Sequence, residues 1–206
     1  MQSVDGTNPG VELEGWLRDP HIKPPEIAHF LDGLSHAERV AAIRSLGRHE
    51  QRNLYEGVDG FRPVALKDLV PETAADFSTV RHFGKNSLPV FTHFEKRFCR
   101  PRSLHGEPVV DLYGFNFQTM APVTGPGYFI ARDAGDRPEV LVDYHRVPPE
   151  HPEGWPPIRS NERGISRFVY GYLVDTLRGV SNHVTIGSAS RKGKDLGSFF
   201  VLCRQE

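Results

Sequence analysis

The chain has 206 residues, the length of one domain or of one domain with a helical appendage, and 38% of them are hydrophobic, which suits a sizeable core. Its 25 lysines and arginines nearly balance its 26 aspartates and glutamates, so the formal net charge is -1. No large field of one sign is therefore available to attract nucleic acid or an anionic membrane. We expect no nucleic-acid partner, and composition leaves the oligomeric state open.

No segment has the pattern of a targeting signal or a membrane span. Residues 1–16 lack a charged stretch followed by an apolar one, and no run approaches the roughly twenty apolar residues that a spanning helix requires. Cys99 and Cys203 each lie in an apolar, strand-like run without a second cysteine at metal-ligand spacing. We predict a cytoplasmic protein with reduced core thiols and no cofactor, and a disulfide or a catalytic cysteine is the less favoured alternative.

Residues 1–60 are predicted to form a helical segment packed on the following domain. Between residues 24 and 58, apolar residues recur at intervals of three and four, which is the period of one buried helical face. Pro24 suits a helix start, and Ser35 followed by Glu38 matches a capping box. The spacing predicts two helices with a break near Gly33–Ser35, which plug or flank one end of the domain.

Residues 61–206 are predicted to form an antiparallel β domain. Short runs rich in Val, Ile, Phe, Tyr and Thr, each bounded by Gly, Pro, Asn or Asp, predict strands within residues 88–99, 109–120, 127–133, 139–147, 167–175, 180–187 and 197–204. The connections at 134–136 and within 184–202 are too short for parallel crossovers. The fold class is therefore mainly β with N-terminal helices, either a closed barrel or a strongly curled sheet, with the proline-rich segment 148–157 as a loop over one end.

The stretch SASRKGKDLGS, residues 188–198, has the composition of a phosphate-binding loop. A P-loop needs four residues between its first glycine and its Gly-Lys pair, but Gly187 and Gly193 enclose five. Asp195 follows Lys194, where it would repel a phosphate, and a strand-like run follows instead of a helix. We interpret the stretch as the turn of the last hairpin.

Alternation along the strands places aromatic residues on one face and histidines and carboxylates on the other. Because buried charges need partners, we expect the aromatic face to point inward and to hold a hydrophobic or aromatic small molecule. The predicted interior residues are Tyr113, Phe115, Phe117, Tyr144 and Tyr172. The predicted polar residues at the mouth are His93, Tyr128, His145, Arg178 and His183.

The three histidines on separate predicted strands leave two alternatives open. His145 or His183 could act as a general acid or base, oriented by Asp143 or Glu95, in an isomerase or cyclase with a largely apolar substrate. His93 with the other two could instead hold a metal ion or a haem. Single histidines without fixed spacing carry no specific metal signature, so no residue is assigned a catalytic or metal-binding role.

A resemblance to a known family covers residues 168–204, which are similar to the ending of the GXWXGRF-type lipocalin-like proteins of unknown function. The matching positions, in the same order and with similar gaps, are Tyr170, Asp175, Arg178, Val180, Gly187, Lys192, Gly193, Phe199, Phe200, Leu202 and Arg204. The family's Gly-x-Trp-x-Gly-Arg-Phe stretch has no counterpart here. The resemblance implies a calycin-type β-barrel like those whose cups bind hydrophobic small molecules.

Overall fold

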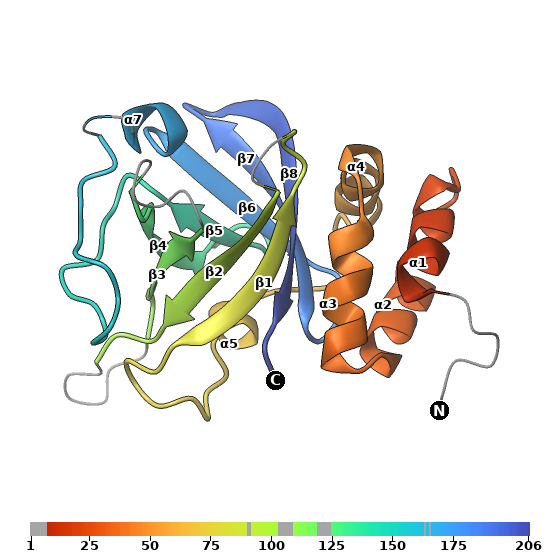
Figure 1. The fold of residues 1–206 in the computed structure, drawn as a ribbon, viewed down its shortest axis with the longest axis horizontal. Coiled ribbons are helices and arrows are strands. Elements are labelled where there is room, and N and C mark those ends of the chain that lie inside the picture. The colour runs from red at the N-terminus through yellow and green to blue at the C-terminus, as the bar shows by residue number, and fades with distance from the viewer. Residues whose placement is uncertain (1–7, 90–91, 103–108, 119–124, 163, 165) are drawn as a thin grey trace.

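The structure is a computed structural model that describes residues 8–89, 92–102, 109–118, 125–162, 164 and 166–206. Its centre is a closed barrel in which every neighbouring pair of strands is antiparallel, in the order β1 to β8, with β8 pairing back to β1 (Figure 1). The strands are β1 (Val80–Asn86), β2 (His93–Cys99), β3 (Leu112–Phe117), β4 (Tyr128–Asp133), β5 (Val140–Asp143), β6 (Leu173–Gly179), β7 (Val184–Arg191) and β8 (Lys194–Arg204). The predicted fold class is confirmed, and the closed barrel is the correct one of its two forms.

A layer of helices lies beside the wall formed by β1, β7 and β8 (Figure 1). The helices of this layer are α1 (Pro9–Arg18), α2 (Pro24–Gly33), α3 (His36–Ser45) and α4 (Arg48–Gly57). The predicted capping box is present, because the Ser35 hydroxyl accepts from the Glu38 amide and the Glu38 carboxylate accepts from the Ser35 amide. The layer covers the side of the barrel, and the prediction that the helices plug or flank one end is wrong.

The helical segment contains more helices than the periodicity predicted. Extended backbone at Gly47 divides the second predicted helix into α3 and α4. Asn8 begins α1 by accepting a hydrogen bond from the Gly10 amide at 2.9 Å, and Pro9 occupies the first helical position. α1 was not predicted, although asparagine followed by proline is a sequence signal for the start of a helix.

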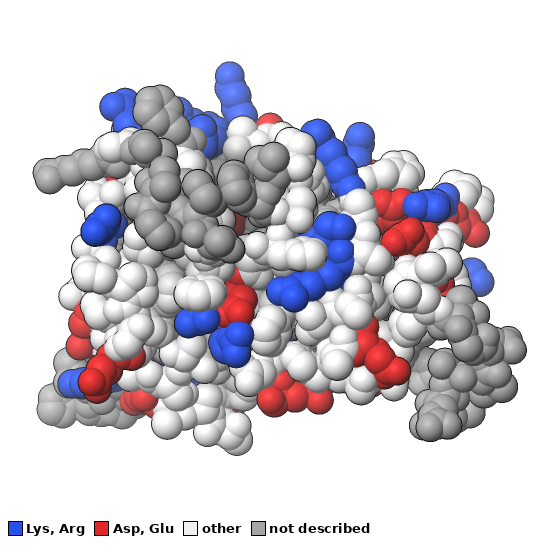
Figure 2. Space-filling view, in the orientation of Figure 1, with Lys and Arg blue, Asp and Glu red and all other residues white. Residues whose placement is uncertain are grey.

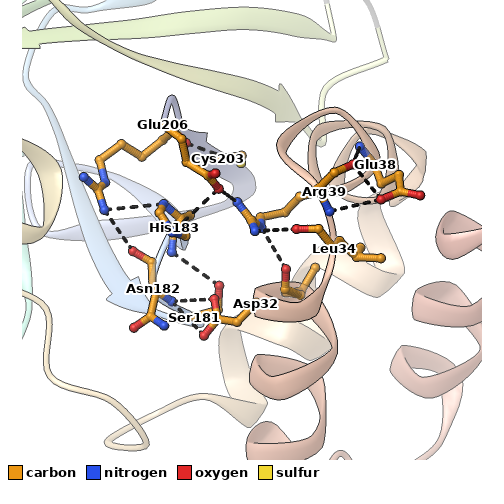
Figure 3. Close-up of polar contacts among 12 residues, drawn as sticks. Asp32, Leu34, Glu38, Arg39, Ser181, Asn182, His183, Cys203 and Glu206 are labelled. Atoms are coloured by element: carbon orange, nitrogen blue, oxygen red, sulfur yellow. Dashed lines mark hydrogen bonds and ion pairs between the residues drawn. The ribbon is translucent and has the colours of Figure 1, made fainter. Parts of the chain in front are cut away.

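Arg39 of α3 ties the helical layer to the barrel (Figure 3). The Arg39 side chain is 3% exposed. Its guanidinium donates hydrogen bonds to the carbonyl oxygens of Leu31 at 2.7 Å and of Leu34 at 2.6 Å, at the C-terminal end of α2. It also pairs with the carboxylate of Glu206, which follows β8. One buried guanidinium therefore provides hydrogen-bond donors for the last carbonyl groups of α2 and attaches Glu206 to α3.

One end of the barrel is filled with apolar side chains. The short helix α5 (Leu66–Leu69) lies at this end (Figure 1) and contributes Leu66 and Leu69 to the interior cluster. From the strands, Phe98, Leu112 and Leu202 complete the packing. The other end, where α7 (Ser166–Val169) lies, holds a cavity that opens between the strands.

Gly187 on β7 marks one place where the interior packing depends on the absence of a side chain. A Cβ at this position would lie 2.2 Å from Cζ of Phe200, whose ring covers the glycine. We expect Gly187→Ala to lower the free energy of unfolding by about 1–3 kcal/mol, the usual effect of overpacking a core. Gly15→Ala is the matched control in helix α1, where no described atom outside the neighbouring helix backbone lies within 4 Å of the new Cβ.

Chemical denaturation of the two variants measures this difference. Gly15→Ala should raise the free energy of unfolding by about 0.5–1 kcal/mol, because alanine loses less backbone entropy in a helix than glycine. If both substitutions changed the free energy of unfolding by a similar, small amount, the close approach of the Phe200 ring would not require a glycine at position 187.

Candidate functional site

The cavity at the α7 end occupies the half of the barrel remote from α5 and has a volume of about 390 Å³. It is bounded by β1, β2, β3, β6, β7 and β8, by residues just beyond β3 and β5, and by the last turn of α7. Most of its wall is apolar, and the aliphatic and aromatic residues that line it are Leu88, Phe94, Tyr144, Val169, Tyr170, Leu173, Ala189, Leu196, Phe199 and Phe200. This half of the barrel is therefore a hydrophobic cup.

Four polar side chains from different strands meet at mid-height in the barrel, beneath this cup. Lys96 lies on β2, Asn116 on β3, Asp175 on β6, and Tyr144 follows β5 directly. Alternation directs Lys96 inward between Phe94 and Phe98, and the register places Lys96 directly opposite Asn116. The side chains of Lys96 and Asp175 are only 2% and 3% exposed, so the barrel encloses a charged pair.

Hydrogen bonds connect the four side chains into one network. Lys96 Nζ donates to Asp175 Oδ2 at 2.9 Å, to Asn116 Oδ1 at 3.2 Å and to the hydroxyl of Tyr144. Asn116 Nδ2 donates to Tyr144 Oη at 2.9 Å, and that hydroxyl donates to Asp175 Oδ2 at 3.3 Å. All three protons of the ammonium group therefore have acceptors, which buried charges require.

Aromatic rings surround the same ammonium group. Its Nζ lies 4.8 Å from the ring centroid of Phe200, 5.0 Å from those of Phe129 and Tyr144, and 6.0 Å from that of Phe94. These are the distances at which the electron-rich face of a ring attracts a cation. The site stabilises positive charge at Nζ by one carboxylate and by a cage of rings, with little contact to water.

Burial and pairing act in opposite directions on the ionisation of this network. Burial lowers the pKa of Lys96, while attraction to the Asp175 carboxylate raises it. Burial likewise raises the pKa of Asp175, against the effect of Lys96. Burial, followed by repulsion from Asp175, raises the pKa of Tyr144 well above its usual value, so the phenol stays protonated. Each of the two charges is therefore stabilised in the barrel mainly by its attraction to the other.

Comparisons with known proteins find no match for this chain, whether among family models, curated proteins or solved structures. The resemblance of residues 168–204 to the lipocalin-like proteins is therefore confirmed only in its coarser part, the closed antiparallel barrel. Within the part of the chain that the structure describes, no helix is long and apolar enough to cross a membrane.

Of the ten residues predicted from the sequence to contact a ligand, only Tyr144 lines this cavity. Three others form a cluster on the outer wall of the barrel with Cys99 and Trp155: they are Tyr113, Phe115 and Tyr128. Trp155 belongs to the proline-rich segment 148–157, which covers this wall instead of an end of the barrel. Burial there raises the pKa of Tyr128, whose hydroxyl donates to the Pro156 carbonyl oxygen.

Phe117, His145 and Tyr172 lie near the surface. Phe117 is 47% exposed, and the guanidinium of Arg97 lies 3.9 Å from its ring centroid. His145 is exposed and contacts the edge of the Tyr172 ring, with 5.2 Å between the ring centroids. The backbone amide of His145 donates to Asp143 Oδ1 at 2.8 Å, so the carboxylate expected to orient the imidazole binds the main chain instead.

The remaining predicted residues also lie away from the cavity. His93 is exposed at the start of β2, and Arg178 on the outer face of β6 pairs with Glu139 Oε1 at 2.8 Å. His183 lies before β7, with Nε2 3.7 Å from the Glu206 carboxylate, in the polar cluster around Arg39 (Figure 3). The three histidines do not converge, and the described residues include no group of three or more His, Cys, Asp or Glu placed to hold a metal ion.

Sequence reasoning missed Lys96, Asn116 and Asp175. The available signal was in residues 93–99, where Lys96 has the same strand parity as Phe94 and Phe98 and therefore shares their face. A lysine on an otherwise aromatic face predicts a buried partner of opposite charge. The partner itself could not be predicted, because Asp175 is 79 residues away and meets Lys96 only across the closed barrel.

Proposed function

We propose that this protein binds a small molecule with an apolar or aromatic body in the barrel cavity. The observation that supports the proposal is the cavity of about 390 Å³, with mainly apolar walls and one polar cluster beneath them. Ligand pockets typically have volumes of about 300–1,000 Å³ and combine hydrophobic walls with a few polar groups that fix orientation. This arrangement suits a ligand whose apolar body lies in the cup.

The polar groups of the cavity indicate which end of the ligand points inward. Lys96 and Arg191 each bring a positive charge to the lining of the cavity, and Asp175 balances that of Lys96. Lysines and arginines also gather along the upper edge of Figure 2, at the end of the molecule where α7 and the β7–β8 hairpin lie. A ligand with a neutral or negative polar group fits these surroundings better than a cationic one.

The apolar wall continues to the surface of the protein. Leu88 is 47% exposed, Leu196 42% and Val169 37%, and all three line the cavity. Exposed apolar side chains at a cavity lower the cost of transferring an apolar ligand from water. We place the ligand entrance between these three residues.

The proposed ligand contacts include one residue that the sequence predicted and three that it did not. Tyr144 is retained as a ligand-contacting residue, and Lys96, Asn116 and Asp175 are added. A lipocalin-like family membership agrees with a hydrophobic ligand, and the two buried free thiols, Cys99 and Cys203, agree with a cytoplasmic location. The alternatives of a histidine acid–base enzyme and a haem protein are not extended, because no described histidine lines the cavity.

Binding of 8-anilinonaphthalene-1-sulfonate, a fluorescent apolar anion, tests the proposal. Ala189 on β7 lines the cavity directly opposite Asp175, so Ala189→Trp should fill the cup and abolish saturable binding. Thr176→Trp adds the same ring on the outer face of β6 and should leave binding unchanged. Leu173→Trp fills the cavity from β6 and should also abolish binding. Agreement between the two cavity-filling variants would show that the loss does not come from misfolding around residue 189.

Melting curves and circular dichroism of the three variants establish that each is folded. Equal binding by the cavity-filling variants and the outer-face variant would show that the probe binds elsewhere, and this would overturn the proposal.

A further inference from the structure

Lys96 differs from the other described lysines in its surroundings. Lys23, Lys67, Lys192 and Lys194 are exposed to solvent and Lys85 is half-buried, whereas Lys96 is 2% exposed. Its amine nevertheless borders the cavity, together with Tyr144 and Asp175. A primary amine at the base of an apolar cup, beside a carboxyl group, is the arrangement in which lysines of proteins condense with carbonyl compounds.

We infer that the ligand of this cavity is an aldehyde or ketone with an apolar body, and that Lys96 binds it as a protonated Schiff base with Asp175 as the counter-ion. The inference rests on the proposed function, since it requires that a small molecule enters the cup, and it names the chemical class of that molecule.

The reaction needs no reactant besides the carbonyl compound. Asp175 Oδ2, which is 2.9 Å from Nζ, accepts one proton from the ammonium group, and the free amine attacks the carbonyl carbon. The new oxyanion takes that proton and becomes the hydroxyl of a carbinolamine. Asp175 then removes a second proton from the nitrogen and delivers it to this hydroxyl, which leaves as water while the C=N bond forms. Two protons of the ammonium group thus end on the water, one stays on the iminium nitrogen, and Asp175 is again a carboxylate.

The product keeps the electrostatics of the present site. An iminium ion at Nζ carries the same positive charge as the ammonium group, and it retains the Asp175 carboxylate and the rings of Phe200 and Phe129, whose centroids lie 4.8 Å and 5.0 Å from Nζ. Tyr144 Oη and Asn116 Oδ1, which now accept from the ammonium group, can bond to the carbinolamine hydroxyl as it forms and leaves. Condensation therefore requires no new buried charge.

Burial also makes this amine more reactive than those at the surface. It lowers the pKa of Lys96 and raises the pKa of Asp175, so the transfer of a proton between them costs less than in water. The low accessibility of the site further protects the C=N bond from hydrolysis by bulk water.

Reductive trapping tests the inference. The full chain is incubated at pH 7 with cinnamaldehyde, an apolar aromatic aldehyde, and sodium cyanoborohydride, which reduces an imine to a stable amine. Peptide mapping by mass spectrometry then compares the lysines within the same molecule. We expect several-fold more adduct at Lys96 than at any exposed lysine, because the cup holds the aldehyde beside this amine and burial lowers the pKa of Lys96.

Three variants sharpen the test. Lys96→Arg keeps a cation at the site but has no primary amine, so its adducts should be confined to surface lysines. Asp175→Asn should form the Lys96 adduct more slowly, because an amide cannot accept and return the protons. Thr176→Trp, on the outer wall, should label Lys96 as the unchanged chain does. An even distribution of adduct over all lysines of the unchanged chain overturns the inference, whether or not the Lys96 and Asp175 variants fold.

A parallel measurement separates failure of this inference from failure of the proposed function. Cinnamyl alcohol has the same apolar body but no carbonyl group, and its displacement of the bound anilinonaphthalene probe reports occupancy of the cup alone. Displacement without labelling of Lys96 would leave the binding function standing and reject the Schiff base. Absence of both would reject the two together.

Discussion

Lys96→Met should lower the free energy of unfolding by about 3–5 kcal/mol at pH 8, because removal of one partner from a buried ion pair leaves the other charge without compensation. Asp175 would then lie as a carboxylate with 3% exposure among aromatic rings, and Asn116 Oδ1 would lose the donor that it has in Lys96. Urea denaturation followed by circular dichroism measures the change, with the midpoint and the slope recorded separately.

The loss caused by Lys96→Met should shrink as the pH falls. Burial already raises the pKa of Asp175, and loss of the Lys96 charge removes the main effect that lowers it. In the variant, a carboxyl group whose pKa is raised in the folded state favours folding below that pKa, where it is neutral, and opposes it above. The variant should therefore be closer in stability to the unchanged chain at pH 5 than at pH 8. A loss that is independent of pH would show that the missing lysine acts through packing and not through its charge.

The double variant Lys96→Met, Asp175→Leu is the control. If the single variant suffers from an unpaired charge, removal of the second charge should restore most of the lost stability, since apolar replacements of a buried ion pair are often neutral or stabilising. The two residues are in contact, so the effects of the single substitutions should not add. An additive loss in the double variant would contradict the account. Restored stability together with lost carbonyl binding would show that the barrel keeps this ion pair for binding.

The strand pattern predicted the barrel because most of its information is local. Each run of β-branched and aromatic residues ends at turn residues, and short connections such as that between Asp133 and Val140 allow only antiparallel neighbours. The sequence left a closed barrel and a curled sheet as alternatives, and the cost of exposed edges favoured closure. These arguments need no contact between distant residues, but they missed β1 (Val80–Asn86), which lies outside every predicted run.

The direction of the side chains was harder to predict, because two parts of the barrel wall are covered on the outside. Val184, Ile186 and Val201 are apolar but face the helical layer, where they pack with residues such as Leu13 and Ile43. Elsewhere, Phe115 and Tyr128 face outward under Trp155. Alternation indicates the interior only when the other face is in water, so here it selected several outward-facing residues as candidates for the ligand site.

Acidification should destabilise the protein through His82, which lies on β1 in the filled half of the barrel and is 1% exposed. Its Nε2 donates to the carbonyl oxygen of Leu69 at 2.9 Å, since a carbonyl can only accept, and this bond attaches the last residue of α5 to the barrel. Its Nδ1 is buried without a hydrogen-bond partner among the described residues, and its ring contacts Phe98 edge to face, with 4.8 Å between the ring centroids. The neutral imidazole fits this site, and the imidazolium does not.

Burial lowers the pKa of His82 to about 3, and repulsion from the charges of Arg204 and Lys96 acts in the same direction, while the bond to Leu69 opposes them. In the unfolded chain the pKa is about 6.5, so between these two values the unfolded state binds one more proton than the folded state. The stability that a neutral His82 confers is complete above the unfolded value and is lost as the pH falls toward the folded value. Between pH 7 and pH 4.5 the loss due to this residue should be about 2–3 kcal/mol.

His82→Gln isolates this contribution, because the glutamine amide can still donate to the Leu69 carbonyl oxygen but does not titrate. Burial also lowers the pKa values of His93 and His183, and since both remain in the variant, their effects cancel when the two stability curves are subtracted. The unchanged chain should lose stability more steeply than His82→Gln below about pH 6.5. Parallel curves would mean that the imidazolium finds a partner in the folded state, which requires α5 to move away from the end of the barrel that it fills.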